Sequence, residues 1–172
     1  MSYEWHSSLV NFTVFISVFL LMIASLHDVV ARAVPNRLAA ALAGSSMLGS
    51  ALQGRLLSGV AAGAIVFGFA LFCWKRGWMG GADVKLLAAA AIAVSPAMVP
   101  IYLCAVSLAG GLLALVYLFG RLLVAKPAVP RQVPRSLSWL ARVLRIERWR
   151  ISRGGPLPYA CAIAAGSAFI LL

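Results

Sequence analysis

Acidic residues are scarce in this sequence: Glu4, Asp28, Asp83 and Glu147 stand against fifteen Lys and Arg in 172 residues. Charged residues make up 11% of the chain and hydrophobic residues 63%, whereas soluble domains carry about a quarter charged residues. A water-soluble core of this size cannot enclose so much apolar surface, so we predict an integral membrane protein. Because the basic residues lie between apolar runs, they are typical of membrane topology signals, and we expect no nucleic-acid partner.

The usual metal ligands are equally sparse. The chain has two histidines, His6 and His27, and three cysteines, Cys73, Cys104 and Cys161, with no Cys-x-x-Cys pair. This inventory excludes a zinc site and a disulfide framework, so we expect no metal and no cofactor. No basic residue precedes the first apolar run, which predicts a first helix that is retained and not cleaved as a secretory signal.

Six apolar runs predict six membrane-spanning helices. A helix that crosses the hydrocarbon core needs about 20 apolar residues, or fewer where neighbouring helices shield its ends. The fourth run is the shortest, and it could instead join the fifth as one broken helix, which would give five spans. The runs cover residues 10–26, 38–52, 56–74, 84–94, 98–124 and 158–172.

The basic residues decide between five and six spans, because Lys and Arg gather on the cytoplasmic side of membrane proteins. With six spans and an outer amino terminus, 14 of the fifteen lie inside and Arg55 alone lies outside. The predicted fold is therefore all-α: a polytopic membrane protein with six transmembrane helices and both termini extracytoplasmic.

Residues 1–172 are expected to form one domain, with a basic cytoplasmic loop at 125–155 between the fifth and sixth helices. Within this loop, residues 137–151 predict a moderately amphipathic helix whose apolar face is interrupted by Glu147. Such a helix could lie on anionic lipid headgroups. A solvated basic loop that only fixes the topology is an equal alternative.

The chain contains two aspartates, and both fall at cytoplasmic ends of predicted spans. Asp28 follows the first span, a few residues before Pro35, and Asp83 follows a glycine pair just before the fourth. Carboxylates at membrane depth are candidates for function, although an interfacial position weakens the inference. The alternative is a pair of ordinary loop carboxylates, with Asp28 bound to Arg32 one helical turn later.

The order of these motifs resembles the type IV prepilin peptidases, membrane aspartyl proteases of the Gly-x-Gly-Asp type. The resemblance covers nearly the whole chain and implies that Asp28 and Asp83 are the catalytic pair. Ala82 departs from the family pattern, which has glycine before the second aspartate; a positive φ there would strain alanine by about 1 kcal/mol. The matching strings are Asp28 with Pro35-Asn36, Asp83-Val84-Lys85, and Pro158-Tyr159-Ala160 at the start of the last span.

The resemblance also implies a substrate and a location. The expected substrate is a prepilin or pseudopilin, whose leader is removed at the cytoplasmic face of the bacterial inner membrane during pilus biogenesis. Larger relatives carry a cysteine-bearing cytoplasmic domain and also methylate the new amino terminus. Only a short segment precedes the first span here, so the chain is similar to the short peptidases of tight-adherence (Flp) pilus systems, without the methyltransferase activity.

The implied chemistry is general acid–base hydrolysis. Two neighbouring carboxylates share one proton; the ionised one activates water and the protonated one donates to the scissile carbonyl. His27 adjoins Asp28 and is expected to be an interfacial residue, not a catalytic one. Two other functions stay open: a small proton-coupled transporter that uses the carboxylates as a relay, and a non-catalytic scaffold of a secretion or pilus assembly.

Overall fold

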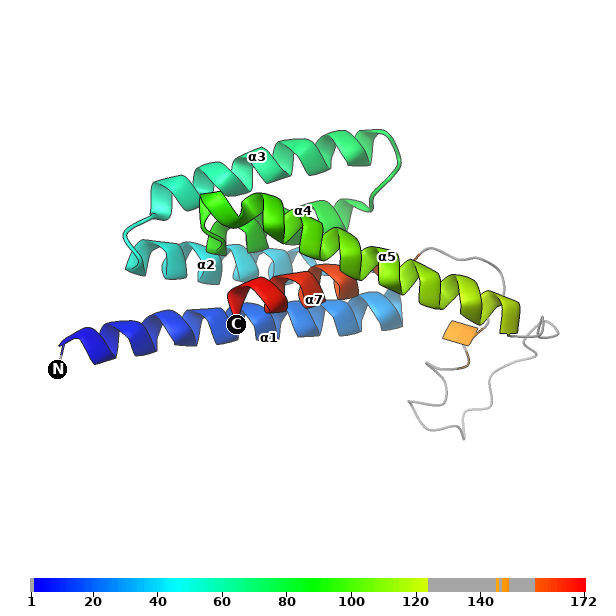
Figure 1. The fold of residues 1–172 in the computed structure, drawn as a ribbon, viewed down its shortest axis with the longest axis horizontal. Coiled ribbons are helices and arrows are strands. Elements are labelled where there is room, and N and C mark those ends of the chain that lie inside the picture. Colours follow the sequence, from blue (N-terminus) through cyan, green and yellow to red (C-terminus); the bar gives the residue numbers. More distant parts are fainter. Residues whose placement is uncertain (1, 124–144, 146, 149–156) are drawn as a thin grey trace.

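The computed structural model describes residues 2–123, 145, 147–148 and 157–172, and every regular element within them is helical (Figure 1). Each predicted apolar run coincides with a helix, although α1 extends well beyond residues 10–26. The predicted loop 125–155 and its helix 137–151 lie almost entirely outside the described residues. The helices are α1 (Ser2–Ala31), α2 (Asn36–Leu52), α3 (Leu56–Lys75), α4 (Gly81–Ala93), a 3₁₀ turn (Pro96–Met98), α5 (Val99–Leu123) and α7 (Tyr159–Leu171).

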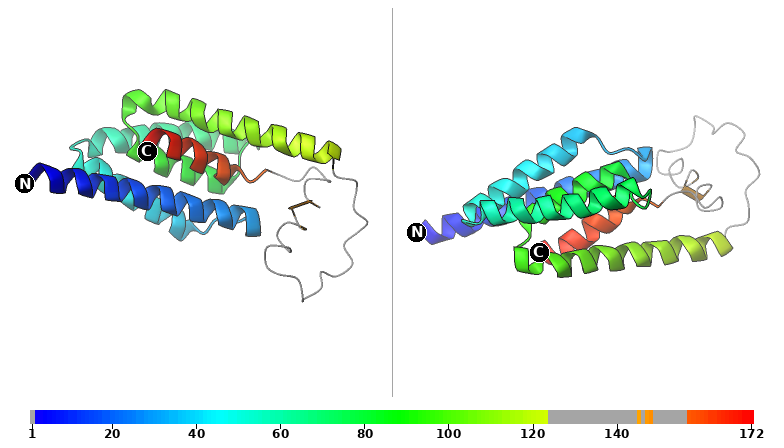
Figure 2. Two further views of the ribbon diagram at one scale, coloured as in Figure 1. Left: turned by 60° about the horizontal axis from the view of Figure 1, so that its bottom comes forward. Right: turned by 90° about the horizontal axis from the view of Figure 1, so that it is seen from above.

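The short helix α4 lies at the centre of the bundle, packed against α2, α3 and α7 (Figure 2). Its residues from Leu86 to Ala91 are all buried, and the run of alanines lets three neighbouring helices approach closely. After α4 the backbone is extended at Val94 and Ser95, as expected for a residue before proline. The fourth and fifth predicted runs are therefore two separate helices.

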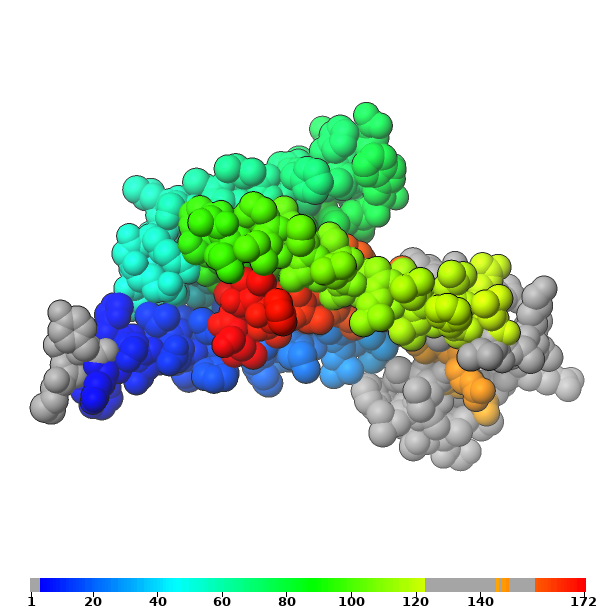
Figure 3. All heavy atoms as spheres, in the orientation of Figure 1, coloured from blue at the N-terminus to red at the C-terminus, as the bar shows by residue number. Residues whose placement is uncertain are grey.

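Helix α7 lies between α1 and α5, as the space-filling view shows (Figure 3). Helix α5 continues beyond the other helices at the end of the bundle where α1 and α3 finish. The chain thus brings the end of α1, the turn from α3 to α4 and the start of α7 to the same end of the molecule.

Polar contacts fix α4 to its neighbours at both ends. Lys85 near its start donates to the Asn36 side chain at the start of α2, with 2.8 Å between Nζ and Oδ1. At the other end, Arg55 donates to the carbonyl oxygens of Ala93 and Val94. The last carbonyls of a helix have no partner within it and carry partial negative charge. Arg55, the one basic residue assigned to the outer side, thus neutralises the end of α4.

Among the described residues, three helices are long and apolar enough to cross a membrane: Glu4–Ala31, Leu56–Lys75 and Pro96–Leu122. Large apolar side chains on each of them are exposed, among them Phe15 (63%) and Leu108 (75%). Contiguous apolar surface of this kind is compatible with lipid and not with water, so the molecule is a membrane protein. Helices α4 and α7 have 13 residues each and reach only about 20 Å at 1.5 Å per residue.

Candidate active site

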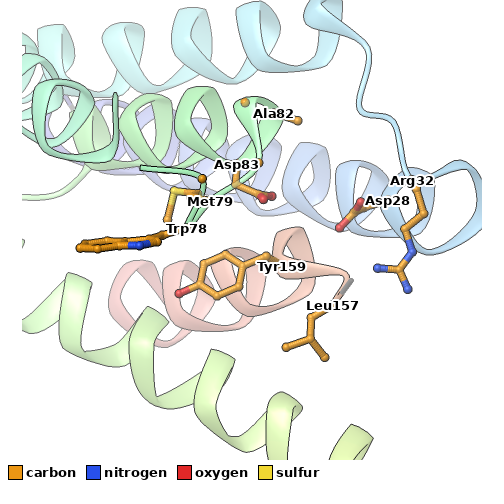
Figure 4. A pocket seen from close by; sticks show the side chains of 11 residues that line it. Asp28, Arg32, Trp78, Met79, Ala82, Asp83, Leu157 and Tyr159 are labelled. Carbon is orange, nitrogen blue, oxygen red and sulfur yellow. The ribbon is translucent and has the colours of Figure 1, made fainter. Parts of the chain in front are cut away.

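A cavity of about 700 Å³ opens where the end of α1, the turn from α3 to α4 and the start of α7 meet (Figure 4). Asp28 and Asp83 both line it, with their carboxyl groups turned toward one another. The structure therefore brings together the two residues that the sequence singles out. The lining residues are Asp28, Arg32, Gly77, Trp78, Met79, Gly80, Gly81, Ala82, Asp83, Leu157 and Tyr159.

Asp83 lies in the first turn of α4, outside the three long apolar segments and ahead of the buried part of its helix. The position places its carboxylate near the positive end of the helix dipole. Burial, and to a lesser extent the negative charge of Asp28, raise the pKa of Asp83 from 3.8 to about 6, and a hydrogen bond from the Gly80 backbone opposes the change. Asp83 therefore holds its proton in mildly acidic solution, up to about pH 6.

Gly80 is required by the close approach of that carboxylate. Its backbone is extended, with φ −72° and ψ 146°, so any residue could adopt its conformation. A Cβ atom added to Gly80, however, would lie 2.8 Å from Oδ2 of Asp83. The glycine thus provides space for the carboxylate. Its conformational freedom is not needed here.

Ala82 causes no strain at the position where the related motif has glycine. It lies within α4, and Arg32 is the one non-glycine residue with a positive φ in the described part of the chain. Ala82 therefore does not have the positive φ that would strain alanine. The motif's first glycine position, Gly80, is the one that the site's geometry constrains.

Asp28 lies in the last turn of α1 and is held by the start of α7. Its Oδ2 accepts a hydrogen bond from the Ala160 backbone N–H at 3.3 Å. Ala160 is the second residue of α7, where N–H groups have no partner within the helix and the dipole is positive. Ser25, one turn earlier on α1, donates to the Ala160 carbonyl at 3.1 Å. The Pro-Tyr-Ala string thus supplies a backbone donor that favours the negative form of Asp28.

Two further residues of the matching strings, Asn36 and Lys85, connect the elements that carry Asp28 and Asp83. The contact from Lys85 to Asn36 ties α4, just after Asp83, to the turn that follows α1. Both residues belong to the strings that carry the resemblance, and their role in the structure is to position the elements that bear the aspartates. Asn36 and Lys85 do not line the cavity.

The turn from α3 to α4 forms one wall. Gly77 has φ +74°, a conformation that favours glycine, and it reverses the chain toward Trp78. The Trp78 ring stands edge-on to Phe72 with centroids 6.3 Å apart, and the Arg76 guanidinium lies 4.9 Å from the Phe72 ring centroid. Trp78 is 70% exposed, so this wall offers an aromatic surface at the mouth of the cavity.

Arg32 and Glu147 were not singled out as site residues. The sequence left open an ion pair between Asp28 and Arg32. In the described residues, Arg32 forms an ion pair with Glu147, with 2.6 Å between Nη2 and Oε1. Glu147 is the single acidic residue of the basic loop. This feature of the sequence could have identified it as a candidate site residue. His27 is exposed and does not line the cavity.

The arrangement presents two carboxylates with unequal surroundings in one solvent-connected cavity, which is the requirement for paired acid and base catalysis. Among residues 2–123, 145, 147–148 and 157–172, no three His, Cys, Asp or Glu side chains gather as a metal site would require.

Comparison with known proteins agrees with this geometry. The model of the type IV leader peptidase family matches residues 15–115, a segment that holds both aspartates and more than half of the chain. No curated protein matches the chain, and no solved structure matches it. The chain belongs to the type IV leader peptidase family.

Proposed function

We propose that this protein is a membrane aspartyl endopeptidase that removes the leader from prepilin-like substrates, with Asp28 and Asp83 as its catalytic pair. One observation carries the proposal: the two aspartates of the chain line one cavity in a member of a leader peptidase family. A transporter relay would place carboxylates near the middle of the membrane, whereas these lie at one end of the bundle.

The surroundings of the two aspartates support a different role for each. Burial favours the protonated form of Asp83, which donates a proton to the scissile carbonyl. The Ala160 N–H and the α7 dipole favour the negative form of Asp28, which takes a proton from the attacking water. The pair shares one proton, so the apparent pKa values belong to the pair and not to either residue. Activity should fall as the pH rises through about 6 and Asp83 loses its proton.

The cavity suits a basic leader. The cytoplasmic face is basic in the proposed topology, yet Asp28, Asp83 and Glu147, three of the four acids of the chain, gather at this end of the bundle. Arg32 balances Glu147 and the aspartate pair shares one proton, so one net negative charge remains at the pair to attract a basic leader. The extended leader junction would lie between the glycine-bearing turn and α7, and the apolar helix of the substrate would follow into the membrane.

The proposed topology has six membrane-crossing helices in the bacterial inner membrane. Both termini lie outside, and the cavity and the loop 125–155 lie on the cytoplasmic side. The support is the distribution of basic residues, of which 14 of fifteen then lie inside, and the structural role found for the fifteenth, Arg55. Anionic lipid is the expected partner of the basic loop, and no methyltransferase activity is expected.

The test is cleavage by the purified protein in detergent or nanodiscs. The substrate is a prepilin with a basic leader that ends in glycine before an apolar segment, and mass spectrometry locates the cut. A matched substrate with the junction glycine replaced by a bulky residue serves as the control. Release of the intact leader from the first substrate and not from the second is expected. Absence of cleavage, with the protein folded, would favour the scaffold.

A further inference from the structure

A groove lies on the outer surface of the bundle, apart from the cavity that holds the aspartates. A short turn joins α2 to α3, and the two helices diverge from that turn toward the start of α2 (Figures 1 and 2). Both pack on α4 and contact each other much less, so α4 forms the floor of the space between them. The groove has a volume of about 540 Å³, and Val60 and Phe67 at its rim are 37% and 42% exposed.

The three helices contribute to the groove in the same way. Each supplies residues at i, i+3, i+4 and i+7, which share one face of a helix, beginning at Asn36 on α2, Val60 on α3 and Lys85 on α4. Seven residues of a helix rise about 10 Å, so the groove runs for that length along the helices. Apart from Asn36 and Lys85, every lining residue is apolar or glycine. The groove is therefore apolar over its length and polar at one end.

The polar end carries positive charge at the membrane surface. It is the end of the bundle where the long apolar helices α1 and α3 finish, which is the level of the lipid headgroups. Lys85 is exposed there, as is Arg37 beside Asn36. The contact from Lys85 to Asn36 uses one of the three N–H donors of the ammonium, and the other two can serve an anion. No acidic residue lines the groove, because Asp83 lines the other cavity.

We propose that the groove binds one anionic phospholipid, with an acyl chain between α2 and α3 and the phosphate at Lys85. Two turns of an α-helix fill roughly 800 Å³ with their side chains, more than the groove offers, whereas an acyl chain is narrower and fits along the α4 floor. Apolar surfaces within a membrane gain little from contact alone, so a preferred lipid needs a polar contact. The proposed topology places Lys85 at the cytoplasmic leaflet, which carries anionic lipids. The inference requires the membrane and not the peptidase activity.

Native mass spectrometry tests the role of the charge. The full chain, purified and delipidated in detergent, is titrated with phosphatidylglycerol or with phosphatidylcholine, and the affinity for the first bound lipid is measured. The wild type should bind phosphatidylglycerol at least about fivefold more tightly, the factor that one cation near a membrane surface contributes. Lys85→Gln should lose this preference, and Lys85→Arg should keep it because it retains the charge. Lys75→Gln, the same change at an exposed lysine at the end of α3, should leave the preference unchanged.

A second pair of variants tests the shape of the groove. Ala64 lines the groove and is exposed, so Ala64→Phe fills the groove without entering a packed helix interface and should lose tight binding of either lipid. Ala61→Phe, at an exposed alanine of α3 outside the groove, is the matched control and should bind as the wild type does. Equal affinities of the wild type for the two lipids, or equal binding by a variant and its control, would overturn the proposal. Displacement of phosphatidylglycerol by a prepilin would also overturn it, because the occupant would then be the apolar helix of the substrate.

Discussion

Replacing Asp83 with Asn should make the protein more stable at neutral pH even though it removes a proposed catalytic group. The pKa of Asp83 is raised to about 6 from an ordinary value of 3.8, so the folded protein binds this proton more tightly than the unfolded chain does. The contribution of Asp83 to stability is therefore most favourable below pH 3.8 and is lost as the pH rises to about 6. Above that pH the ionised group costs about 3 kcal/mol.

Asparagine cannot ionise and avoids this cost. Loss of the carboxylate's hydrogen bond from Gly80 offsets about 1 kcal/mol of the gain. A net gain of about 2 kcal/mol raises the Tm of a chain of this length by about 4–8 °C. Thermal unfolding followed by circular dichroism in detergent at pH 4 and pH 7.5 measures it, with Glu4→Gln as the exposed control. A difference between Asp83→Asn and wild type that is absent at pH 7.5, or equal at both pH values, would refute the reasoning.

Three further results are expected. Gly80→Ala should lower kcat/KM at least tenfold, because the added Cβ lies 2.8 Å from Oδ2 of Asp83, whereas Gly68→Ala, with no atom within 4 Å of the added Cβ, should retain activity; equal rates would contradict the geometry. Single cysteines at Ser2 and Ser136 in a cysteine-free protein should react with an impermeant reagent from opposite sides of the membrane, and labelling from the same side would refute the six-span topology. Cleavage should persist in strong chelators, and a loss reversed by added metal would show that the carboxylates act through a cation.

The helices could be predicted from the sequence because apolar runs and their interruptions are local. Pro35 and Pro96 mark the turns that follow α1 and α4, and the glycines before Asp83 mark the start of α4. The same strings predicted that Asp28 and Asp83 are the residues of interest, and the structure places both in one cavity.

The contacts that shape the site could not be predicted, because they join residues far apart in the chain. The hydrogen bond from the Ala160 backbone to Asp28 depends on how α7 meets α1. The pairing of Arg32 with Glu147 spans 115 residues, and local spacing favoured Asp28 as the partner instead. The close approach of Asp83 to Gly80 is a distance between atoms, which a glycine-rich string by itself does not specify.

Cleavage of a prepilin substrate by the asparagine variants tests the central claim most directly. Asn retains the size of Asp and most of its polar contacts but cannot transfer the proton, so Asp28→Asn and Asp83→Asn should each lower the rate by about 10²–10⁴-fold or more. The double variant should be little slower than either single one, because the two groups act as a unit. Circular dichroism on the same samples confirms that each variant is folded. Cleavage at close to the wild-type rate by either folded single variant would contradict the assignment of Asp28 and Asp83 as the catalytic pair.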